Sequence, residues 1–332
     1  MSLSGQRIVV TGGAGFIGSH LVEALVRAGA RVAVYDNFSS GFEDNIADVA
    51  HDVEVVRGDI LDPEALNRVV RGADAIAHQA AQLEIMKCIE TPVEDLRSNA
   101  EGTLNVLEAA RRNDVRRVVW ASSACVYGQA QTVPEAETHP RAPNWPYGIS
   151  KLAAEHYARL YYDYYGFDTV GLRYSIVYGP REWYGRVMTA YLRRALDGGS
   201  PVIWGGTQQR DFVYVEDVVR MNVACLAAET SLRNQVFNVS TGRATSIREL
   251  AEMVSRTFGL GEPIVEDIAE GEVSNLVAGR MRLPAELQRM VLDPGAAREV
   301  VGWRPTTELP AGMMAEMEWL RANADRWSVM HY

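Results

Sequence analysis

Residues 9–18 read Val9-Val10-Thr11-Gly12-Gly13-Ala14-Gly15-Phe16-Ile17-Gly18. An apolar run that predicts a β-strand precedes the glycines, and a helical pattern from Ser19 to Ala28 follows them and ends at Gly29. Glycines allow a tight turn and a close approach of the backbone to a pyrophosphate, while the N-terminus of the next helix offers N–H groups to the phosphates. In this strand–loop–helix context the stretch predicts a dinucleotide-binding loop.

The end of the second predicted strand indicates which dinucleotide fits. Asp36 closes the run Val32-Ala33-Val34-Tyr35-Asp36, where a carboxylate can accept hydrogen bonds from the adenosine ribose and would repel a 2′-phosphate. Since no Arg stands at 37 or 38, the sequence favours NAD over NADP. Asp59, after the third strand, is placed either to meet the adenine edge or to form a turn. The candidate cofactor-binding residues of this part are Gly12, Gly15, Phe16, Ile17, Gly18, Asp36, Asn37, Asp59 and Ile60.

Short β-branched runs alternate with helical patterns through the first half of the chain, which predicts a Rossmann-type, doubly wound parallel sheet of the α/β class. We expect this NAD-binding domain to span 1–178 and a smaller α/β substrate-binding domain to span 179–332. A strand–helix pair near 211–228 is expected to return to the main sheet. The expected strands are Ile8–Val10, Arg31–Tyr35, Val53–Val56, Ala75–Ala77, Val118–Ala121 and Thr169–Arg173.

The composition narrows the class of protein. The 332 residues are 47% hydrophobic and 23% charged, as in a globular protein of about two domains. A formal charge of −10 argues against a nucleic-acid partner. No apolar run approaches the roughly 18 residues of a membrane-spanning helix, and no export signal is expected. Three separated cysteines and six scattered histidines predict no disulfide and no metal, and favour a reducing cytoplasm.

A candidate catalytic pair stands in Pro146-Tyr147-Gly148-Ile149-Ser150-Lys151, which places a phenol and an ammonium on one face of a predicted helix. A phenol with a pKa near 10 acts as a base at neutral pH only if a cation lowers that pKa. We expect Lys151 and an oxidised nicotinamide to supply this field, so that Tyr147 exchanges a proton with a substrate hydroxyl. The same spacing also occurs on solvated helix faces, and the glycine loop and strands before it favour the catalytic interpretation.

Further motifs follow in order along nearly the whole chain. With GGAGFIG and YGISK, they resemble the extended short-chain dehydrogenase/reductase family, in particular its nucleotide-sugar epimerase and dehydratase group, including the UDP-glucose 4-epimerases. These motifs are His78-Gln79-Ala80-Ala81, Asn99-Ala100-Glu101-Gly102-Thr103, Ala121-Ser122-Ser123-Ala124-Cys125-Val126-Tyr127-Gly128 and Arg210-Asp211-Phe212-Val213-Tyr214-Val215-Glu216-Asp217-Val218.

The resemblance implies a role for each matching residue. Ser123 would hydrogen-bond the reacting hydroxyl, Tyr147 would be the base and Lys151 would hold the nicotinamide ribose. Arg210 would bind the phosphates of a nucleotide sugar with its planar guanidinium. His78 would belong to a turn that lines the cofactor pocket. Further cofactor-binding residues would be Gln79, Ala80, Ala81, Asn99, Tyr147, Lys151 and Tyr174.

The residues after Ser123 bear on the reaction. Dehydratases and decarboxylases of the family usually carry an acid two positions after this serine, whereas this chain has Ala124-Cys125. We therefore expect 4-epimerisation, in which a keto sugar rotates and regains hydride on its other face. Cys125 supports an alternative reaction, 3,5-epimerisation, because Ser-Ser-Ala-Cys-Val-Tyr resembles a motif of 3,5-epimerases. In that reaction the thiol would need a lowered pKa. Cys125 could equally be a small buried residue.

Two other classes remain as alternatives. A reductase or dehydratase would leave a net change in the cofactor or the sugar, and a catalytically silent NAD-binding sensor would need only the glycine loop. The presence of Ser123, Tyr147 and Lys151 argues against the sensor.

The chain departs from the family pattern at the substrate. Ile176 stands where UDP-sugar enzymes commonly have an amide that contacts the diphosphate, and the segment 267–291 lacks the usual Arg shortly before Gly-Asp. Glu84 stands where a small or basic residue is common. Positive charge could come from Arg181, Arg186, Arg280 or Arg282, and Arg181 or Arg186 could instead bind a sugar carboxylate.

Two predicted helices carry broad apolar faces, from Val93 to Ala110 and from Leu152 to Tyr165. Such faces can pack across a two-fold axis, so we expect a homodimer, with packing inside one chain as the competing use.

Overall fold

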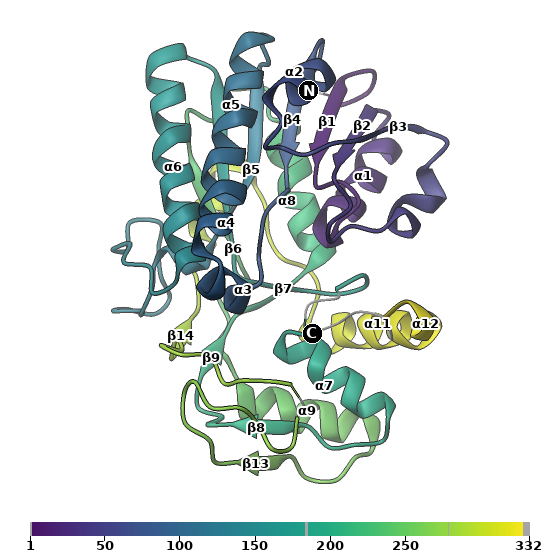
Figure 1. Cartoon of the computed structure of the whole chain (residues 1–332), viewed down its shortest axis with the longest axis vertical. Coiled ribbons are helices and arrows are strands. Elements are labelled where there is room, and N and C mark those ends of the chain that lie inside the picture. Colours follow the sequence, from purple (N-terminus) through teal and green to yellow (C-terminus); the bar gives the residue numbers. More distant parts are fainter. Residues whose placement is uncertain (1, 183–184, 278, 328–332) are drawn as a thin grey trace.

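The structure is a computed structural model that describes residues 2–182, 185–277 and 279–327. A seven-stranded sheet fills the upper part of the molecule in Figure 1, and all of its neighbouring strands are parallel. The predicted Rossmann-type α/β fold is thereby confirmed. In spatial order the strands are β11 (Val236–Val239), β6 (Asp168–Tyr174), β5 (Arg117–Ser123), β4 (Ala75–His78), β1 (Arg7–Thr11), β2 (Arg31–Asp36) and β3 (Val53–Arg57).

Helices cover both faces of this sheet because alternate side chains of each strand point to opposite sides. Val9 faces the layer of α2 (Pro63–Val70), α5 (Gly102–Arg112) and α6 (Pro146–Tyr165). Ile8 and Val10 face the layer of α1 (Phe16–Arg27) and α8 (Val215–Ala227). Burial on both faces explains why the strands are almost uniformly apolar.

Several shorter helices lie between these strands and helices along the chain. The 3-10 helix η1 (Glu43–Val49) follows β2. A π-helical stretch connects α4 and α5, and π-helical turns are frequent at functional sites. The elements around it are α3 (Ile85–Glu90), α4 (Pro92–Leu96), η2 (Arg97–Glu101) and, after β5, η3 (Ala124–Val126).

The lower part of the molecule in Figure 1 is built from short strands and the remaining helices. Its strand pairs are β7 (Ile176–Tyr178) with β10 (Phe212–Tyr214), β8 (Val202–Trp204) with β13 (Ile264–Glu266), and β9 (Gln209–Arg210) with both β12 (Thr245–Ser246) and β14 (Arg289–Met290). Its helices are α7 (Val187–Leu196), α9 (Ile247–Phe258), α11 (Leu309–Ala322) and α12 (Ala324–Trp327), whereas α10 (Gly295–Val301) packs on β11 of the main sheet.

The return of residues 211–228 to the main sheet differs from the expectation in one respect. Helix α8 packs on α1 and on the main sheet, but β10 pairs with β7 and does not join that sheet. The added strand is β11, which pairs with β6. A short strand that runs straight into α8 cannot reach the sheet edge, whereas β11 arrives after the crossover helix, as the other parallel strands do.

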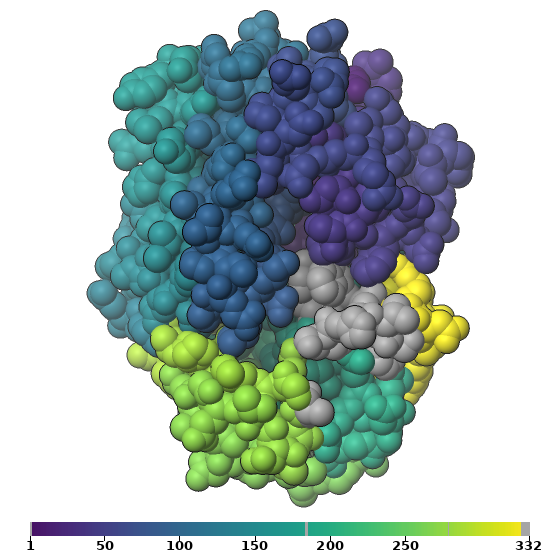
Figure 2. Space-filling model, in the orientation of Figure 1, coloured from purple at the N-terminus to yellow at the C-terminus, as the bar shows by residue number. Residues whose placement is uncertain are grey.

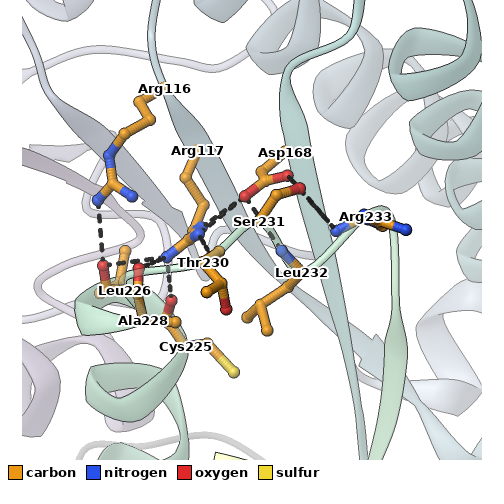
Figure 3. A network of polar contacts seen from close by, with 10 residues as sticks. All are labelled: Arg116, Arg117, Asp168, Cys225, Leu226, Ala228, Thr230, Ser231, Leu232 and Arg233. Carbon is orange, nitrogen blue, oxygen red and sulfur yellow. Dashed lines mark hydrogen bonds and ion pairs between the residues drawn. The ribbon is translucent and has the colours of Figure 1, made fainter. Parts of the chain in front are cut away.

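At the amino end of the sheet a buried arginine joins two strands to the chain after α8 (Figure 3). Arg117, only 1% exposed, donates to Asp168 at 2.8 Å and to the carbonyl oxygens of Cys225, Ala228 and Thr230 at 2.7–2.8 Å. Ser231 donates to the same carboxylate. Both buried charges therefore have several hydrogen-bond partners, far from the carboxyl ends of the strands.

Candidate functional site

The candidate residues gather at the carboxyl ends of the parallel strands, where open α/β sheets bind ligands. Thr11, Asp36, Ser123 and Tyr174 are the last residues of β1, β2, β5 and β6. Figure 2 shows the surface hollowed between the blue segment that contains α3 and α4 and the purple N-terminal segment. The sheet thus presents its functional edge to the smaller domain.

The glycine loop fits closely against its neighbours. Gly12 has a φ of +68°, and a Cβ there would lie 2.6 Å from the Ala80 amide nitrogen. A Cβ on Gly18 would lie 2.0 Å from the carbonyl oxygen of Gly12. Side chains are therefore excluded at both positions, and the amides at the start of α1 stay open to a phosphate group.

Asp36 lies beside this loop. Its carboxylate accepts hydrogen bonds from the amides of Ala14 at 2.9 Å and Phe38 at 2.8 Å. Asp59 accepts from the Asn37 side chain at 2.9 Å and from the Leu61 amide at 2.8 Å. The predicted ribose and adenine residues thus share one corner of the sheet, and the clash-free cradle with its carboxylate fits NAD.

The turn after β4 is fixed by buried polar contacts. His78 contacts the hydroxyls of Thr11 at 2.6 Å and Thr103 at 3.0 Å, and burial lowers its pKa to about 3. The ring is therefore neutral, which suits a structural role. Gln79 and Tyr174 hydrogen-bond each other at 3.1 Å.

Asn222 of α8 also hydrogen-bonds to both Tyr174 and Gln79, and the sequence analysis did not predict this residue as part of the site. It donates to Tyr174 at 2.8 Å and accepts from Gln79 at 3.0 Å. Ala80 and Ala81 follow directly in the chain. Only the return of α8 to the sheet brings Asn222 here, and no local motif marks it.

Asn99 lies within the π-helical stretch η2 and ties three segments together. Its side-chain amide donates to the Gln82 carbonyl at 2.9 Å, to Asp95 at 2.7 Å and to Ser150 at 3.3 Å. Ser150 precedes Lys151, so this contact positions the start of α6 against the loop after β4.

The Ser123, Tyr147 and Lys151 side chains form the centre of the site. Ser123 ends β5, and Tyr147 and Lys151 lie one turn apart on α6. The Lys151 ammonium lies 5.8 Å from the centre of the Tyr147 ring and donates to the Ala121 carbonyl at 2.9 Å. The Ser123 hydroxyl hydrogen-bonds the Tyr147 phenol. A hydroxyl, a phenol and a cation are therefore aligned for proton transfer.

Burial is the main influence on the proton affinities of Tyr147 and Lys151. Burial raises the pKa of Tyr147 well above 10, although its contact with Ser123 opposes the rise. Burial lowers the pKa of Lys151 to about 8, against the charge of Asp95. These directions describe the protein without its cofactor, so the expected lowering of the Tyr147 pKa by Lys151 together with an oxidised nicotinamide stays a prediction.

Comparisons with known proteins agree with this geometry. The model of the NAD dependent epimerase/dehydratase family matches residues 8–240. The UDP-glucose 4-epimerase of Mycolicibacterium smegmatis is 35% identical over 324 residues, 95% of this chain and 99% of that one. The dTDP-glucose 4,6-dehydratase of Streptomyces niveus is 32% identical over 335 residues, 97% of this chain and 95% of that one. A crystal structure of the Thermotoga maritima UDP-glucose 4-epimerase with UDP-glucose has a TM-score of 0.86 at 33% identity and covers 96% of this chain and 100% of that chain.

The chain belongs to the NAD dependent epimerase/dehydratase family. The predicted resemblance and the predicted cofactor, NAD, are thereby confirmed.

In this member of the epimerase/dehydratase family, Cys125 is a buried residue of η3. Its backbone amide donates to the Ser123 hydroxyl oxygen at 3.1 Å. Burial raises the pKa of its thiol, and the charges of Arg210 and Arg186 offset this only in part. A nucleophilic or basic thiol needs the opposite shift, so the geometry favours the packing role over the 3,5-epimerase role.

Two arginines of the smaller domain face this centre. Arg210 on β9 is close enough for its charge to act on Cys125, and Arg186 acts on both Cys125 and Tyr147. Arg210 lies 3.6 Å from Glu286, which also contacts Arg282 at 3.1 Å. The 267–291 segment therefore brings Arg282 beside Arg210, which the spacing of the motif did not show.

The other substrate candidates lie differently. Arg181 pairs with Glu23 and contacts Ser19, both on α1, and so faces the cofactor helix. Glu84 is exposed at the start of α3. Ile176 is on β7 and packs against the apolar cluster around Cys125. Of these three, only Ile176 lies against the residues around Tyr147.

Proposed function

We propose that the protein is an NAD-dependent nucleotide-sugar 4-epimerase that works through a transient 4-keto sugar. The observation that carries the proposal is the assembled Ser123, Tyr147 and Lys151 centre followed by Ala124 and a buried, neutral Cys125. The family resemblance implies that dehydratases usually carry an acid at the second of these positions, and elimination of water needs such a proton donor. Without it, return of the hydride to the other face of the sugar is the simplest outcome.

Each residue of the centre has a distinct task. Bound NAD would supply the hydride acceptor and a positive charge in this site. Tyr147 takes the proton from the sugar hydroxyl, and Ser123 orients that hydroxyl through its contact with the phenol. Lys151, held by the Ala121 carbonyl, presents its ammonium to the cofactor side of Tyr147. When hydride returns, Tyr147 gives the proton back, so the cofactor shows no net change.

The substrate is proposed to be a UDP-sugar first and another nucleotide sugar second. Two of the compared proteins are named UDP-glucose 4-epimerases, and one was crystallised with UDP-glucose. Arg210 and Arg282 form a cationic pair that can hold a diphosphate in bidentate contacts. These guanidinium groups would then replace the side-chain amide that UDP-sugar enzymes commonly have where this chain has Ile176.

The test uses the NAD-loaded protein with UDP-, dTDP-, GDP- and CDP-sugars, and resolves the products by NMR. We expect an epimer at C4, no change in the absorbance of reduced nicotinamide and no dehydrated sugar. Tyr147→Phe should lower turnover roughly 100-fold or more because the proton acceptor is lost. Dehydrated, decarboxylated or net-reduced products would contradict the proposal, and NAD binding without any turnover would favour the sensor.

We also propose that the protein works as a homodimer in a reducing cytoplasm. The exposed apolar side chains Val93, Leu96, Tyr157, Leu160 and Tyr164 lie on α4 and α6, which contact each other. Such a face suits a two-fold interface. The three cysteines are free and buried, which suits a reducing compartment. No helix in the described part of the chain combines the length and the apolar character needed to cross a bilayer.

A further inference from the structure

Two buried carboxyl groups meet where the smaller domain touches the end of the chain. Glu182 follows β7 and is 1% exposed, and Glu316 on α11 is fully buried. Helices α7 and α11 pack against each other between the two parts of the molecule (Figure 1). Within the described residues, one oxygen of Glu316 has no hydrogen-bond donor, and neither oxygen of Glu182 has a well-aligned one, although the Arg186 guanidinium lies 2.9 Å from Glu182. Buried oxygens of this kind are costly, which calls for a physical explanation.

The groups around the pair come from four elements. On α7, the Thr189 hydroxyl donates to Glu316 at 3.0 Å. Before α7, the Arg186 guanidinium forms an ion pair with Glu182 at 2.9 Å. Tyr178 on β7 and Tyr214 on β10 both lie close enough to Glu316 for a charge on its carboxyl group to raise the pKa of their phenols. Arg186 is thus the cation that faces the two carboxyl groups among these neighbours.

The two carboxyl groups differ in how they hold a proton. Burial raises the pKa of Glu316 well above its ordinary value, and the charge of Glu182 raises it further. Burial raises the pKa of Glu182 to about 7, against the charge of Arg186. Above neutral pH the pair therefore holds one proton, mainly on Glu316, and Glu182 takes up a second proton as the pH falls through about 7.

The ion pair connects this cluster to the reacting centre. Arg186 caps α7, is 26% exposed and is close enough to lower the pKa of both Cys125 and Tyr147. Its flexible side chain has several rotamers, and an ion pair with a rigid, buried carboxylate restricts them. Glu182 therefore fixes the direction in which the guanidinium points.

We propose that Glu182 is a positioning residue that holds the Arg186 guanidinium toward the Ser123 and Tyr147 centre, and that the neutral carboxyl group of Glu316 keeps Glu182 charged. The inference rests on the proposed function in one respect, since Arg186 is taken to bind an anionic group of the nucleotide sugar. As the pH falls through about 7, Glu182 takes up a proton and the hold on Arg186 weakens. Substrate binding therefore weakens on the acid side.

The experiment measures binding, which does not depend on turnover. UDP-glucose is titrated calorimetrically into the NAD-loaded protein, with dTDP-, GDP- and CDP-glucose as alternatives. We expect Glu182→Gln and Arg186→Gln each to weaken binding about tenfold at pH 8. The double variant should be no weaker than the weaker single variant, because Glu182 acts through Arg186. The affinity of the native protein should fall between pH 8 and pH 6, and that of Glu182→Gln should stay flat.

Glu318→Gln is the matched control, because Glu318 is exposed on the same helix as Glu316. A roughly hundredfold loss in the double variant would mean independent effects and would overturn the inference. Native affinity in Glu182→Gln would overturn it as well, as would failure of the native protein to bind any of the four sugars. Binding without epimerisation would contradict only the proposed function and would leave this inference standing.

Discussion

Two clusters of buried charge lie in different parts of the molecule and are built in opposite ways. At the amino edge of the sheet, Arg117 and Asp168 are surrounded by carbonyl oxygens, amides and a hydroxyl (Figure 3). Beside the reacting centre, Glu182 and Glu316 share few donors and one cation. Arg117 and Asp168 in the first cluster each have several hydrogen-bond partners, whereas carboxyl oxygens of the second cluster lack well-aligned donors among the described residues.

The proton affinities reflect this difference. Although burial raises the pKa of Asp168, Ser231 and Arg117 hold it below its ordinary value. The pKa values of Glu182 and Glu316 are raised instead. A cluster that serves only the fold can be fully hydrogen-bonded, whereas the proposed positioning of Arg186 uses a carboxylate that titrates near neutral pH.

The largest effect should come from Arg117→Met. The change leaves Asp168 and three carbonyl oxygens buried without their main donor, and breaking a buried pair from one side costs about 3–5 kcal/mol. We expect that loss in the free energy of unfolding, measured by urea denaturation, with nearly native turnover in the folded fraction. Arg116→Met is the control, since the neighbouring Arg116 side chain donates to the Leu226 carbonyl at the longer distance of 3.4 Å. A loss below about 1 kcal/mol in Arg117→Met would show that the network is not structural.

Much of the functional edge was predictable from local sequence. The glycine loop, Asp36 and the Tyr147–Lys151 spacing each depend on a few neighbouring residues, and the parallel sheet follows from alternating apolar patterns. These features lie where expected because strand ends fix their positions.

The remaining features depend on contacts between distant segments. Nothing near Glu182 in the sequence indicates Glu316, because α11 reaches it only through the packing of the smaller domain. The choice of β11 over β10 depends on the crossover through α8. Burial, which raises the pKa of Tyr147, is a property of the whole fold.

A smaller effect is expected for Glu316→Gln, with the opposite sign. The amide mimics the protonated acid, keeps the acceptor for Thr189 and removes the need to bind a proton on folding. A carboxyl group whose folded pKa is raised makes stability fall as pH rises above its unfolded value, near 4.5. The variant should therefore gain about 1–3 kcal/mol at pH 8, and the gain should vanish near pH 4.5. Urea denaturation across this range measures it, and a gain that grew toward acid pH would contradict the shared proton.

The smallest effect should come from Ser231→Ala, which tests whether the amino-edge cluster contains spare hydrogen bonds. Ser231 is one of several donors to Asp168, and the amide of Leu232 still donates to that carboxylate at 3.2 Å after the change. We expect a loss of about 1 kcal/mol, close to the net value of one hydrogen bond, because the carboxylate keeps Arg117. The pKa of Asp168 should rise toward its ordinary value, so the loss should be present at pH 7 and disappear as the pH falls through the pKa of Asp168. A loss as large as that of Arg117→Met would mean that the cluster tolerates no missing donor. The Asp168 carboxylate would then depend on every one of its hydrogen bonds, and the contrast with Glu182 and Glu316 would fail.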